Sequence, residues 1–502
     1  MTLQPDDEFN RALQSFVHPS DWQNPRPSGR YNLVVLGGGT AGLVTAAAAA
    51  GLGAKVALVE KHLLGGDCLN VGCVPSKALL SAAHAVHAVR RASEFGIDAE
   101  PASVVNFPAV MQRMRKLRAS IAHNDSAARF RELGVDVFLG EGKFTSPAEL
   151  EVAGARLRFA RAVVATGARA AAPQIQGLQD VGFLTNETVF SLTELPKRLG
   201  IIGAGPIGCE MAQAFRRFGS QVTVFGKDKC VLPREEAPAR ELLAAALRRE
   251  GIALELGVDV VSVIAVDGGK QIAFKSTSGA TQTVAVDEIL VAAGRAPNVE
   301  GLGLETVGVT YDLHSGIKVD DQLRTTNRSI FAAGDVTGGY QFTHAADAMA
   351  RIVIKNALFF GRQRCSALVV PWATYTDPEV ARVGISADEA KRRGIHVTTH
   401  EVEMRSVDRA ILEGNTEGFA RIHVDPKGYI LGATIVARHA GDLIPTVVLA
   451  MTNRLKLGRI GGTIFPYPTQ AEVVKKLADT ANRGRLTPRL KRIFTRLLRW
   501  RR

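Results

Sequence analysis

The chain has 502 residues, of which 46% are hydrophobic and 22% charged, a composition typical of a globular protein with several domains. Its five cysteines are too few and too scattered for a small secreted protein held together by disulfides. The net charge of +13 belongs largely to residues 483–502, which hold nine Arg or Lys and no acid, so that 13 less 9 leaves +4 for the rest.

Residues 1–30 carry four prolines and no sustained hydrophobic period, which predicts an irregular arm before the first core strand. Asp6, Asp7 and Glu8 stand where a signal peptide would carry positive charge, and no segment approaches the ~20 uncharged apolar residues that span a bilayer. We therefore expect the protein to work in a reducing cytoplasm.

A strand, a glycine turn, an alanine-rich helix and a second strand are predicted from Tyr31 onward. Gly37, Gly39 and Gly42 give G-x-G-x-x-G directly after the strand LVVL, where glycines permit a tight turn and let a pyrophosphate approach the helix N-terminus. Glu60 ends the second strand, 23 positions after Gly37, where a carboxylate can accept hydrogen bonds from a ribose. This combination predicts a nucleotide site rather than a glycine turn without a ligand.

Two cysteines, Cys68 and Cys73, follow within GGDCLNVGCVPSK. On a regular helix five residues rise about 7.5 Å, beyond the usual 4.4 to 6.8 Å between the Cα atoms of a disulfide, but Gly72 can supply a bend. Pro75 suits the first turn of a helix, which would put Cys73 near a helix N-terminus that stabilises a thiolate. The spacing indicates a pair that cycles between disulfide and dithiol. The alternatives are two unrelated thiols or a zinc site, for which no second cysteine pair is nearby.

A second unit of the same design contains GAGPIG, with Gly203, Gly205 and Gly208 in the same spacing. Twenty-three positions after Gly203 stands Gly226, followed by Lys227, so the carboxylate of the first unit is missing. Glycine leaves room for a 2′-phosphate and lysine could neutralise it, which favours NADPH over NADH. Alternatively, Lys227 is solvated and other groups hold the ribose. The repeat predicts two dinucleotide-type domains, each a mostly parallel sheet covered by helices.

Residues 366–482 alternate strand-like runs such as GFARIHV with helical runs, which predicts an α+β domain without a nucleotide fingerprint. A tail helix then begins at Pro488, with Thr487 as its N-cap. Its polar face is basic, so residues 485–502 could lie on an anionic membrane or pack on the protein's own dimer, while nucleic acid is disfavoured because no reading motif accompanies the charge. The apolar face comprises Leu490, Ile493, Phe494, Leu497 and Leu498, with Trp500 at its edge.

These motifs, together with VAAGRAPN and SIFAAGDVTG, resemble the FAD-dependent pyridine nucleotide-disulfide oxidoreductases, a family that includes mercuric reductase, dihydrolipoamide dehydrogenase and glutathione reductase. The resemblance implies FAD on the first glycine motif, with Gly334 and Asp335 reaching its ribityl chain, and a homodimer made through the last domain. It also implies that Cys73 faces the flavin and Cys68 meets the substrate. By the same pattern Lys77 is the lysine near the flavin and Glu210 is its acidic partner.

The fold class implied is α/β, with two Rossmann-like domains in a glutathione reductase-like arrangement and a C-terminal α+β dimerisation domain. We expect an N-terminal arm (1–30), an FAD-binding domain in two parts (31–172 and 297–365), an NAD(P)-binding domain (173–296), a dimerisation domain (366–482) and a basic tail helix (483–502).

The family pattern breaks at FPYPTQAE, where Tyr467 replaces the histidine of the acid-base dyad and Glu472 remains. A phenol titrates near pH ~10 and an imidazole near ~6.5, so proton delivery to an outgoing thiol is impaired. Mercuric reductase shares this tyrosine, which makes a thiol-reactive acceptor, with Hg(II) as one candidate, the first reading. Residues 1–502 show neither an N-terminal metal-binding module nor a C-terminal cysteine pair, and we expect both departures to count against efficient reduction of mercury. The alternatives are a reductase of a small disulfide and a membrane-docked flavoprotein that donates electrons to a quinone or a protein.

Overall fold

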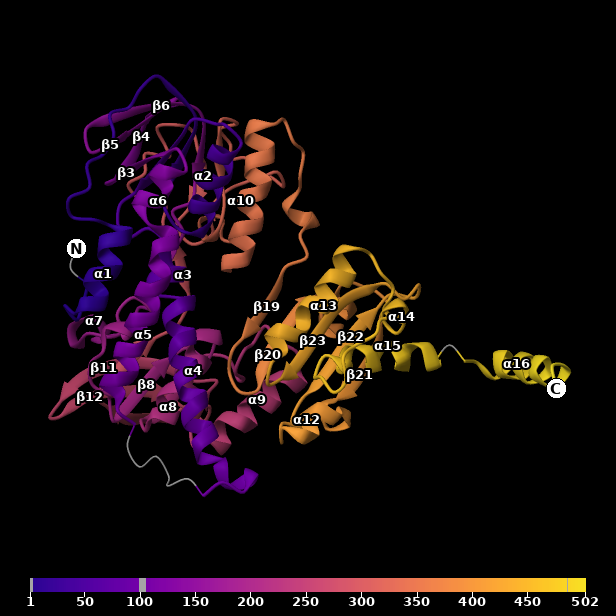
Figure 1. Cartoon of the computed structure of the whole chain (residues 1–502). Helices are drawn as coiled ribbons and strands as arrows, with labels where there is room; N and C mark the ends of the chain where they lie inside the picture. Colours follow the sequence, from indigo (N-terminus) through magenta and orange to yellow (C-terminus); the bar gives the residue numbers. More distant parts are fainter. Residues whose placement is uncertain (1–2, 99–104, 485) are drawn as a thin grey trace. The chain divides into compact units, whose positions relative to one another are not determined.

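The computed structural model describes residues 3–98, 105–484 and 486–502, and the chain divides into two compact units (Figure 1). Unit 1 comprises Met1–Ala204, Met211–Lys227 and Gly251–Leu368, and unit 2 comprises Gly205–Glu210, Asp228–Glu250 and Val369–Arg502. Residues 1–2, 99–104 and 485, which fall in the expected arm, the expected FAD-binding domain and the expected tail, lie outside the described residues.

Unit 1 is built on a large, mostly parallel sheet. Along its first strand Leu33 and Val35 pack into one core and Val34 and Leu36 into another, because successive side chains of a strand face opposite sides. The strands run in the order β3 (Val135–Leu139), β2 (Val56–Glu60), β1 (Arg30–Leu36), β6 (Ala155–Val164), β5 (Glu149–Val152) and β4 (Gly142–Ser146), and β18 (Ile330–Ala332) pairs with β6.

Helices cover one face of this sheet and carry the segments of interest. Helix α2 (Thr40–Gly51) packs against α10 (Thr343–Leu358), and both contribute to the core on the side of Leu33. Five further helices follow in chain order: α3 (Gly66–Asn70), α4 (Cys73–Arg90), α5 (Phe107–Ala122), α6 (Ala127–Glu132) and α7 (Leu178–Val181).

A second parallel sheet repeats the design. Its order is β10 (Ala253–Leu256), β9 (Gln221–Gly226), β8 (Arg198–Ile202) and β14 (Glu288–Val291), and α8 (Pro206–Phe218) follows β8. An antiparallel sheet of β11 (Asp259–Val266), β12 (Gly269–Lys275) and β13 (Thr281–Val286) shares a core with it. The two Rossmann-like sheets confirm the α/β class. The two short remaining sheets are β7 (Ala168–Ala170) with β15 (Arg295–Pro297), and β16 (Tyr311–Asp312) with β17 (Gly316–Ile317).

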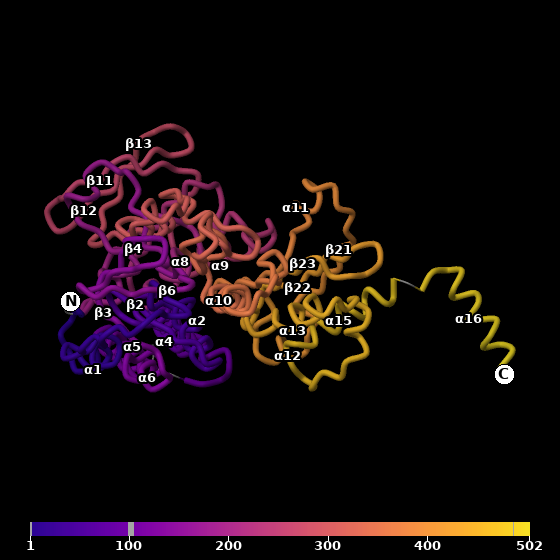
Figure 2. Tube along the Cα trace, turned by 90° about the horizontal axis from the view of Figure 1, so that it is seen from above, coloured from indigo at the N-terminus to yellow at the C-terminus, as the bar shows by residue number. Residues whose placement is uncertain are grey.

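The expectation of an irregular N-terminal arm is wrong for its middle third, which forms helix α1 (Glu8–Val17). Asp7 caps the helix by accepting a hydrogen bond from the backbone N–H of Asn10 at 2.8 Å. Leu13 and Val17 are fully buried, and α1 packs along α5, as Figure 2 shows. The prolines lie outside these ten residues, so they bound the helix instead of breaking it.

Unit 2 contains the antiparallel sheet and helices of the predicted α+β domain, together with Gly205–Glu210 and Asp228–Glu250, which were expected in the NAD(P)-binding domain. Its antiparallel sheet has the order β19 (Pro371–Thr374), β20 (Glu379–Gly384), β23 (Ile430–Ala437), β22 (Phe419–Val424) and β21 (Thr398–Glu403). Helix α13 (Ala440–Thr452) packs on β20 and β23, and α15 (Glu472–Gly484) packs on β21 and β22. The other helices are α9 (Ala237–Arg249), α11 (Ala387–Arg392), α12 (Asp408–Leu412), α14 (Leu457–Ile460) and α16 (Pro488–Trp500).

Helix α16 begins as the sequence predicts, since Thr487 accepts a hydrogen bond from the N–H of Leu490 at 3.2 Å. It buries none of its residues. Among the described residues, no helix is both long enough and apolar enough to cross a bilayer.

Candidate functional site

The two cysteines of GGDCLNVGCVPSK lie on successive helices of unit 1. Cys68 is in the middle of α3, and Cys73 is the first residue of α4, where Gly72 is the N-cap and Pro75 is buried in the first turn. A Cβ on Gly72 would stand 2.7 Å from the carbonyl oxygen of Asp67, so only glycine allows the chain to double back between the cysteines. The bend expected from the sequence is therefore where the structure has it.

The two thiols form a hydrogen-bonded pair. The hydrogen bond with Cys73, followed by burial, raises the pKa of Cys68 well above its ordinary value. Cys68 therefore holds its proton more firmly than a free thiol does and donates it toward the Cys73 sulfur, which lies at the N-terminus of α4, where a helix favours negative charge. Thr343, the first residue of α10, brings its hydroxyl oxygen to 3.4 Å from the Cys73 sulfur. No local sequence pattern points to Thr343, because the contact joins residues 270 positions apart.

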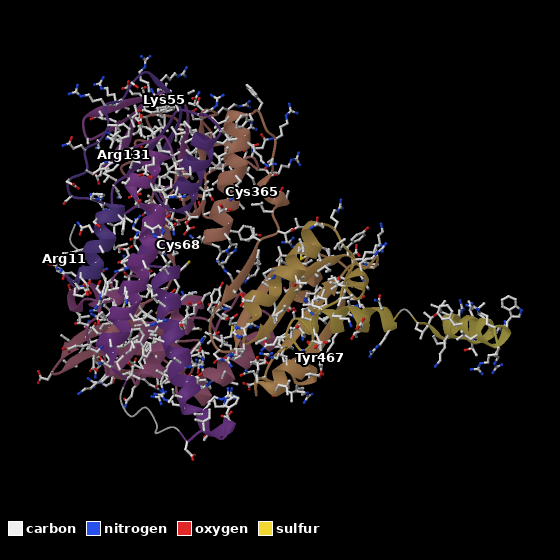
Figure 3. All side chains as sticks on the ribbon, viewed as in Figure 1. Arg11, Lys55, Cys68, Arg131, Cys365 and Tyr467 are labelled. Carbon is white, nitrogen blue, oxygen red and sulfur yellow. The ribbon has the colours of Figure 1, made fainter. Side chains whose placement is uncertain are left out.

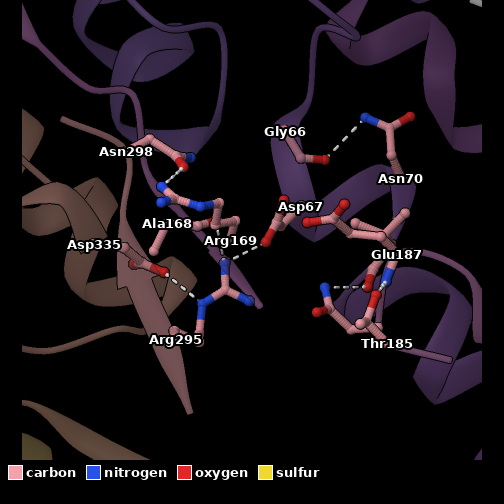
Figure 4. Close-up of polar contacts among 12 residues, drawn as sticks. Gly66, Asp67, Asn70, Ala168, Arg169, Thr185, Glu187, Arg295, Asn298 and Asp335 are labelled. Carbon is pink, nitrogen blue, oxygen red and sulfur yellow. Dashed lines mark hydrogen bonds and ion pairs between the residues drawn. The ribbon is translucent and has the colours of Figure 1, made fainter. Parts of the chain in front are cut away.

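A single arginine connects the helix of Cys68 to the expected ribityl-binding residues, as Figure 4 shows. Arg295, from the motif VAAGRAPN, donates to the carboxylate of Asp67 and, at 2.7 Å, to the carbonyl of Ala168. Its Nε lies 3.5 Å from the Asp335 carboxylate. Burial raises the pKa of Asp335, and the charge of Arg295 counteracts the increase. The motif VAAGRAPN pointed to this segment, but it did not predict that Arg295 contacts Asp67 and Asp335.

The first glycine motif fits a bound dinucleotide. Gly37 has φ +110°, and a Cβ there would stand 2.3 Å from the carbonyl oxygen of Ala165; a Cβ on Gly42 would stand 1.8 Å from the oxygen of Gly37. Gly39 is the N-cap of α2 and makes no side-chain capping bond, so the first N–H groups of the helix remain for a phosphate. The Glu60 carboxylate accepts from the N–H groups of Gly38 at 2.5 Å and His62 at 2.6 Å, and its other lone pairs can take ribose hydroxyls.

The expected ribityl-binding pair also suits this group. Gly334 has φ +80° and precedes the short helix η4 (Asp335–Thr337), and its added Cβ would approach Ala41 of α2 at 3.3 Å. The segment therefore runs close to the start of α2, on the side of the first glycine motif. These residues fit FAD.

The second glycine motif repeats the local geometry of the first. Gly203 has φ +119°, a Cβ on it would stand 2.3 Å from the oxygen of Ala292, and its N–H donates to Phe225 at 2.8 Å. Gly205 precedes α8 and Gly208 lies in its first turn. Lys227 is exposed directly after β9.

Lys77 and Glu210 belong to different units. Lys77 is half-buried in the second turn of α4, in unit 1. Glu210 is buried in unit 2, where its Oε1 accepts from the N–H of Tyr375 at 2.9 Å. The ion pair expected between them stays a prediction.

Tyr467 lies in unit 2 on the loop before α15, as Figure 3 shows, and Glu472 is the first residue of that helix. The phenol is 71% exposed and donates to Asp408 Oδ2 at 3.0 Å. This hydrogen bond, assisted by the charge of Glu472, raises the pKa of Tyr467 above its ordinary value. The tyrosine therefore holds its proton at neutral pH even more firmly than a free phenol.

Comparisons with known proteins agree with this geometry. Residues 31–350 match the family Pyridine nucleotide-disulphide oxidoreductase, and residues 370–478 match its dimerisation domain. Mercuric reductase from Lysinibacillus sphaericus is 34% identical over 90% of this chain and 82% of its own length. Dihydrolipoyl dehydrogenase from Chlamydia muridarum is 34% identical over 88% of this chain and 95% of its own length. The HOCl-induced flavoprotein disulfide reductase RclA from Escherichia coli has a TM-score of 0.80 at 29% identity, covering 89% of this chain and 99% of that chain. The chain therefore belongs, as its motifs predict, to the FAD- and NAD(P)H-dependent pyridine nucleotide-disulfide oxidoreductases.

Proposed function

We propose that this protein, as a homodimer, uses NADPH to reduce a thiol-reactive acceptor through the pair Cys68 and Cys73, and that Hg(II) is a candidate acceptor. The observation that carries the proposal is the hydrogen-bonded contact between the two thiols at the start of α4. A nicotinamide donates a hydride, whereas a disulfide accepts an electron pair through sulfur. Bound FAD would supply the chemistry that connects the two.

The two cysteines would have different roles in this reaction. Cys73, at the N-terminus of α4, would face the flavin, and Cys68, the donor of the thiol pair, would meet the acceptor. Thr343 and the N-terminus of α4 would stabilise the Cys73 sulfur in its anionic form. Two soft sulfur ligands suit a soft metal ion. The balanced reaction is NADPH and Hg(II) giving NADP⁺, a proton and Hg(0), with no proton delivered to a leaving group.

The contact of Tyr467 favours this acceptor over a disulfide. A disulfide substrate needs one added proton for each turnover, to give two thiols from NADPH, and Tyr467 holds its own through Asp408. Mercuric reductases are among the relatives of this chain at 34% identity. Glu472 or water would have to supply that proton if a small disulfide were the substrate, which is the alternative reading.

The test compares NADPH oxidation by the purified protein with Hg(II) plus excess thiol, with lipoamide and with glutathione disulfide. We expect turnover with Hg(II), its loss in Cys68→Ser and Cys73→Ser, and its retention in Cys230→Ser, which removes a thiol elsewhere in the chain. Faster turnover of lipoamide than of Hg(II) would contradict the proposed acceptor and favour a disulfide reductase.

The second motif has Gly226 at the position where the first has Glu60, and the exposed Lys227 follows Gly226. This difference supports a preference for NADPH. A lysine there can pair with the 2′-phosphate that distinguishes NADPH from NADH. Values of kcat/KM for the two nicotinamides decide the point, and a preference for NADH would overturn it.

A second candidate function, electron transfer to a quinone at an anionic membrane, is favoured by helix α16. Its apolar residues Ile493, Phe494 and Leu498 are exposed, and its other face is basic. Such a helix can lie in the headgroup region, with Trp500 at the interface. The balanced reaction would convert NADPH, a proton and quinone to NADP⁺ and quinol.

Co-sedimentation with vesicles tests this candidate. The full chain should pellet with vesicles containing anionic phospholipid and remain in solution with neutral ones, whereas a chain ending at residue 484 should remain in solution with both. Equal pelleting of the two chains would contradict docking on the membrane through α16. A change in dimer stability without vesicle binding would indicate that α16 packs on the protein itself.

A further inference from the structure

The N-terminal helix α1 is connected by buried hydrogen bonds to the segment between the two cysteines. Asn10 Oδ1 of α1 accepts a hydrogen bond from Arg118 Nη2 of α5 at 2.6 Å. Arg118 Nη1 donates in turn to the backbone carbonyl of Asn70 at 2.6 Å. Asn10, Arg118 and Asn70 are 2%, 4% and 4% exposed, so solvent does not compete for these bonds.

Asn70 is the last residue of α3, two positions after Cys68 and three before Cys73. Its side chain donates to the carbonyls of Leu64 at 3.0 Å and Gly66 at 2.9 Å, across the helix that carries Cys68. Arg118 therefore places a cation at the carbonyl end of α3, where helix carbonyls lack partners within the helix. Burial lowers the pKa of Arg118 to about 10, which leaves it charged at neutral pH.

Other contacts attach the arm to the same region. The carbonyl of Val17, at the end of α1, accepts from the N–H of Leu64 at 3.2 Å, and His18 contacts the carbonyl of His62. At the other end of α1, Asp7 accepts a hydrogen bond from Arg115 of α5. The arm thus holds both α5 and the segment that enters α3.

We propose that α1 is a positioning element for the cysteine pair, and that the chain Asn10–Arg118–Asn70 fixes the separation of Cys68 and Cys73. This inference rests on the proposed cycling of the two cysteines. A disulfide closes more readily when the loop between its thiols is already ordered, because less conformational entropy is lost on closure. Removing the restraint on Asn70 should therefore disfavour the disulfide relative to the dithiol.

The test equilibrates the holoenzyme with glutathione buffers and counts free thiols at positions 68 and 73 by alkylation and mass spectrometry. In the exchange, glutathione disulfide is reduced to two glutathione molecules as the Cys68–Cys73 disulfide forms. For Asn10→Ala we expect the equilibrium constant for disulfide formation to fall about tenfold, the effect of one hydrogen bond to a charged group. For a two-electron couple this is about 30 mV.

Two further variants keep the inference falsifiable. Arg11→Ala alters the same helix at an exposed residue whose side chain bonds to Asp6, and it should leave the equilibrium unchanged. Asn10→Asp loses the bond from Asn10 Nδ2 to Pro5 but keeps an acceptor for Arg118, so it should restore the equilibrium to within about twofold.

Each outcome has a distinct meaning. A lower melting temperature for Asn10→Ala with an unchanged thiol equilibrium would overturn the inference and leave α1 a purely structural element. Equal shifts in Asn10→Ala and Arg11→Ala would overturn it as well, since they would not act through Arg118. Failure of the proposed function would appear instead in the unmodified protein, as a pair that forms no disulfide in any buffer.

Discussion

Replacing Glu236 by glutamine should destabilise unit 2 in a pH-dependent way. The carboxylate lies just before α9 and is 5% exposed. Its Oε1 lies 3.0 Å from His423 Nε2 of β22 and accepts from the N–H of Ala387 at 3.3 Å. Burial alone would raise the pKa of Glu236, but hydrogen bonds from His423 and Thr434 outweigh it and hold the pKa at about 2.

The magnitude follows from the difference between the ordinary pKa of 4.5 and about 2. It corresponds to about 3 kcal/mol of stability from ionised Glu236 at pH 7. Because the pKa in the folded state is lowered, this contribution is complete above about pH 4.5 and is lost as the pH falls toward 2. At pH 3.5 about 1.4 kcal/mol of it should be gone.

The assay is urea denaturation of the unmodified protein and Glu236→Gln between pH 7 and pH 3.5, followed by tryptophan fluorescence, to which Trp372 of unit 2 contributes. The free energies of unfolding should differ by about 3 kcal/mol at pH 7, and the difference should shrink as the pH falls. A difference that is the same at both pH values, or that is absent at pH 7, would refute the reasoning.

Glu379, also in unit 2, provides a control of opposite sign. Burial, aided by the nearby carboxylates of Asp442, Asp377 and Glu210, raises its pKa to about 7, although the N–H of Gly441 opposes the increase. Its folded state therefore favours the proton, and stability is lost as the pH rises from about 4.5 through 7. Glu379→Gln should be more stable than the unmodified protein by about 3 kcal/mol at pH 8 and nearly equal at pH 4.5, and a variant less stable at pH 8 would contradict this assignment.

Three further predictions concern the cofactors and the acceptor. Lys227→Glu should lower kcat/KM for NADPH about tenfold and leave that for NADH within about twofold, because it reverses a surface charge worth on the order of 1 kcal/mol; an equal fall for both nicotinamides would count against a contact with the 2′-phosphate. Tyr467→His should raise the turnover of glutathione disulfide about 100-fold, since an imidazole can deliver the missing proton, and unchanged turnover would show that the tyrosine is not limiting. Gly37→Ala should be purified with little flavin, because its Cβ would stand 2.3 Å from the oxygen of Ala165, and a normal ratio of flavin to protein absorbance would argue against FAD at this motif.

Local sequence patterns predicted the features that depend on local geometry. The glycine motifs, the start of α4 at Cys73 and the N-cap of α16 each follow from backbone requirements within a few residues. The contacts of Arg295 with Asp67 and of Arg118 with Asn70 join residues 228 and 48 positions apart. No local propensity specifies such pairs, because tertiary packing brings them together.

Helix α1, which was not predicted, has a local sequence signal but depends on tertiary packing for its stability. Asp7, Phe9, Leu13 and Val17 give an N-cap and an apolar face at helical spacing, but the segment is only ten residues long and prolines stand before and after it. A helix this short is marginal in isolation, so its stability must come from packing on α5. Its apolar period is confined to the interval between Pro5 and Pro19.

The two terminal helices, α1 and α16, lie outside the residues that match the family. They differ in whether their side chains are buried, and this difference indicates different roles. Helix α1 buries Asn10, Leu13 and Val17 and contacts the cysteine-bearing segment through Arg118. Helix α16 buries no residue and presents an apolar face beside a basic one. Loss of α1 should therefore alter the thiol equilibrium of a protein free in solution. Loss of α16 should leave that equilibrium unchanged and alter only the binding of a partner, because an amphipathic helix without buried contacts gains its stability from whatever covers it.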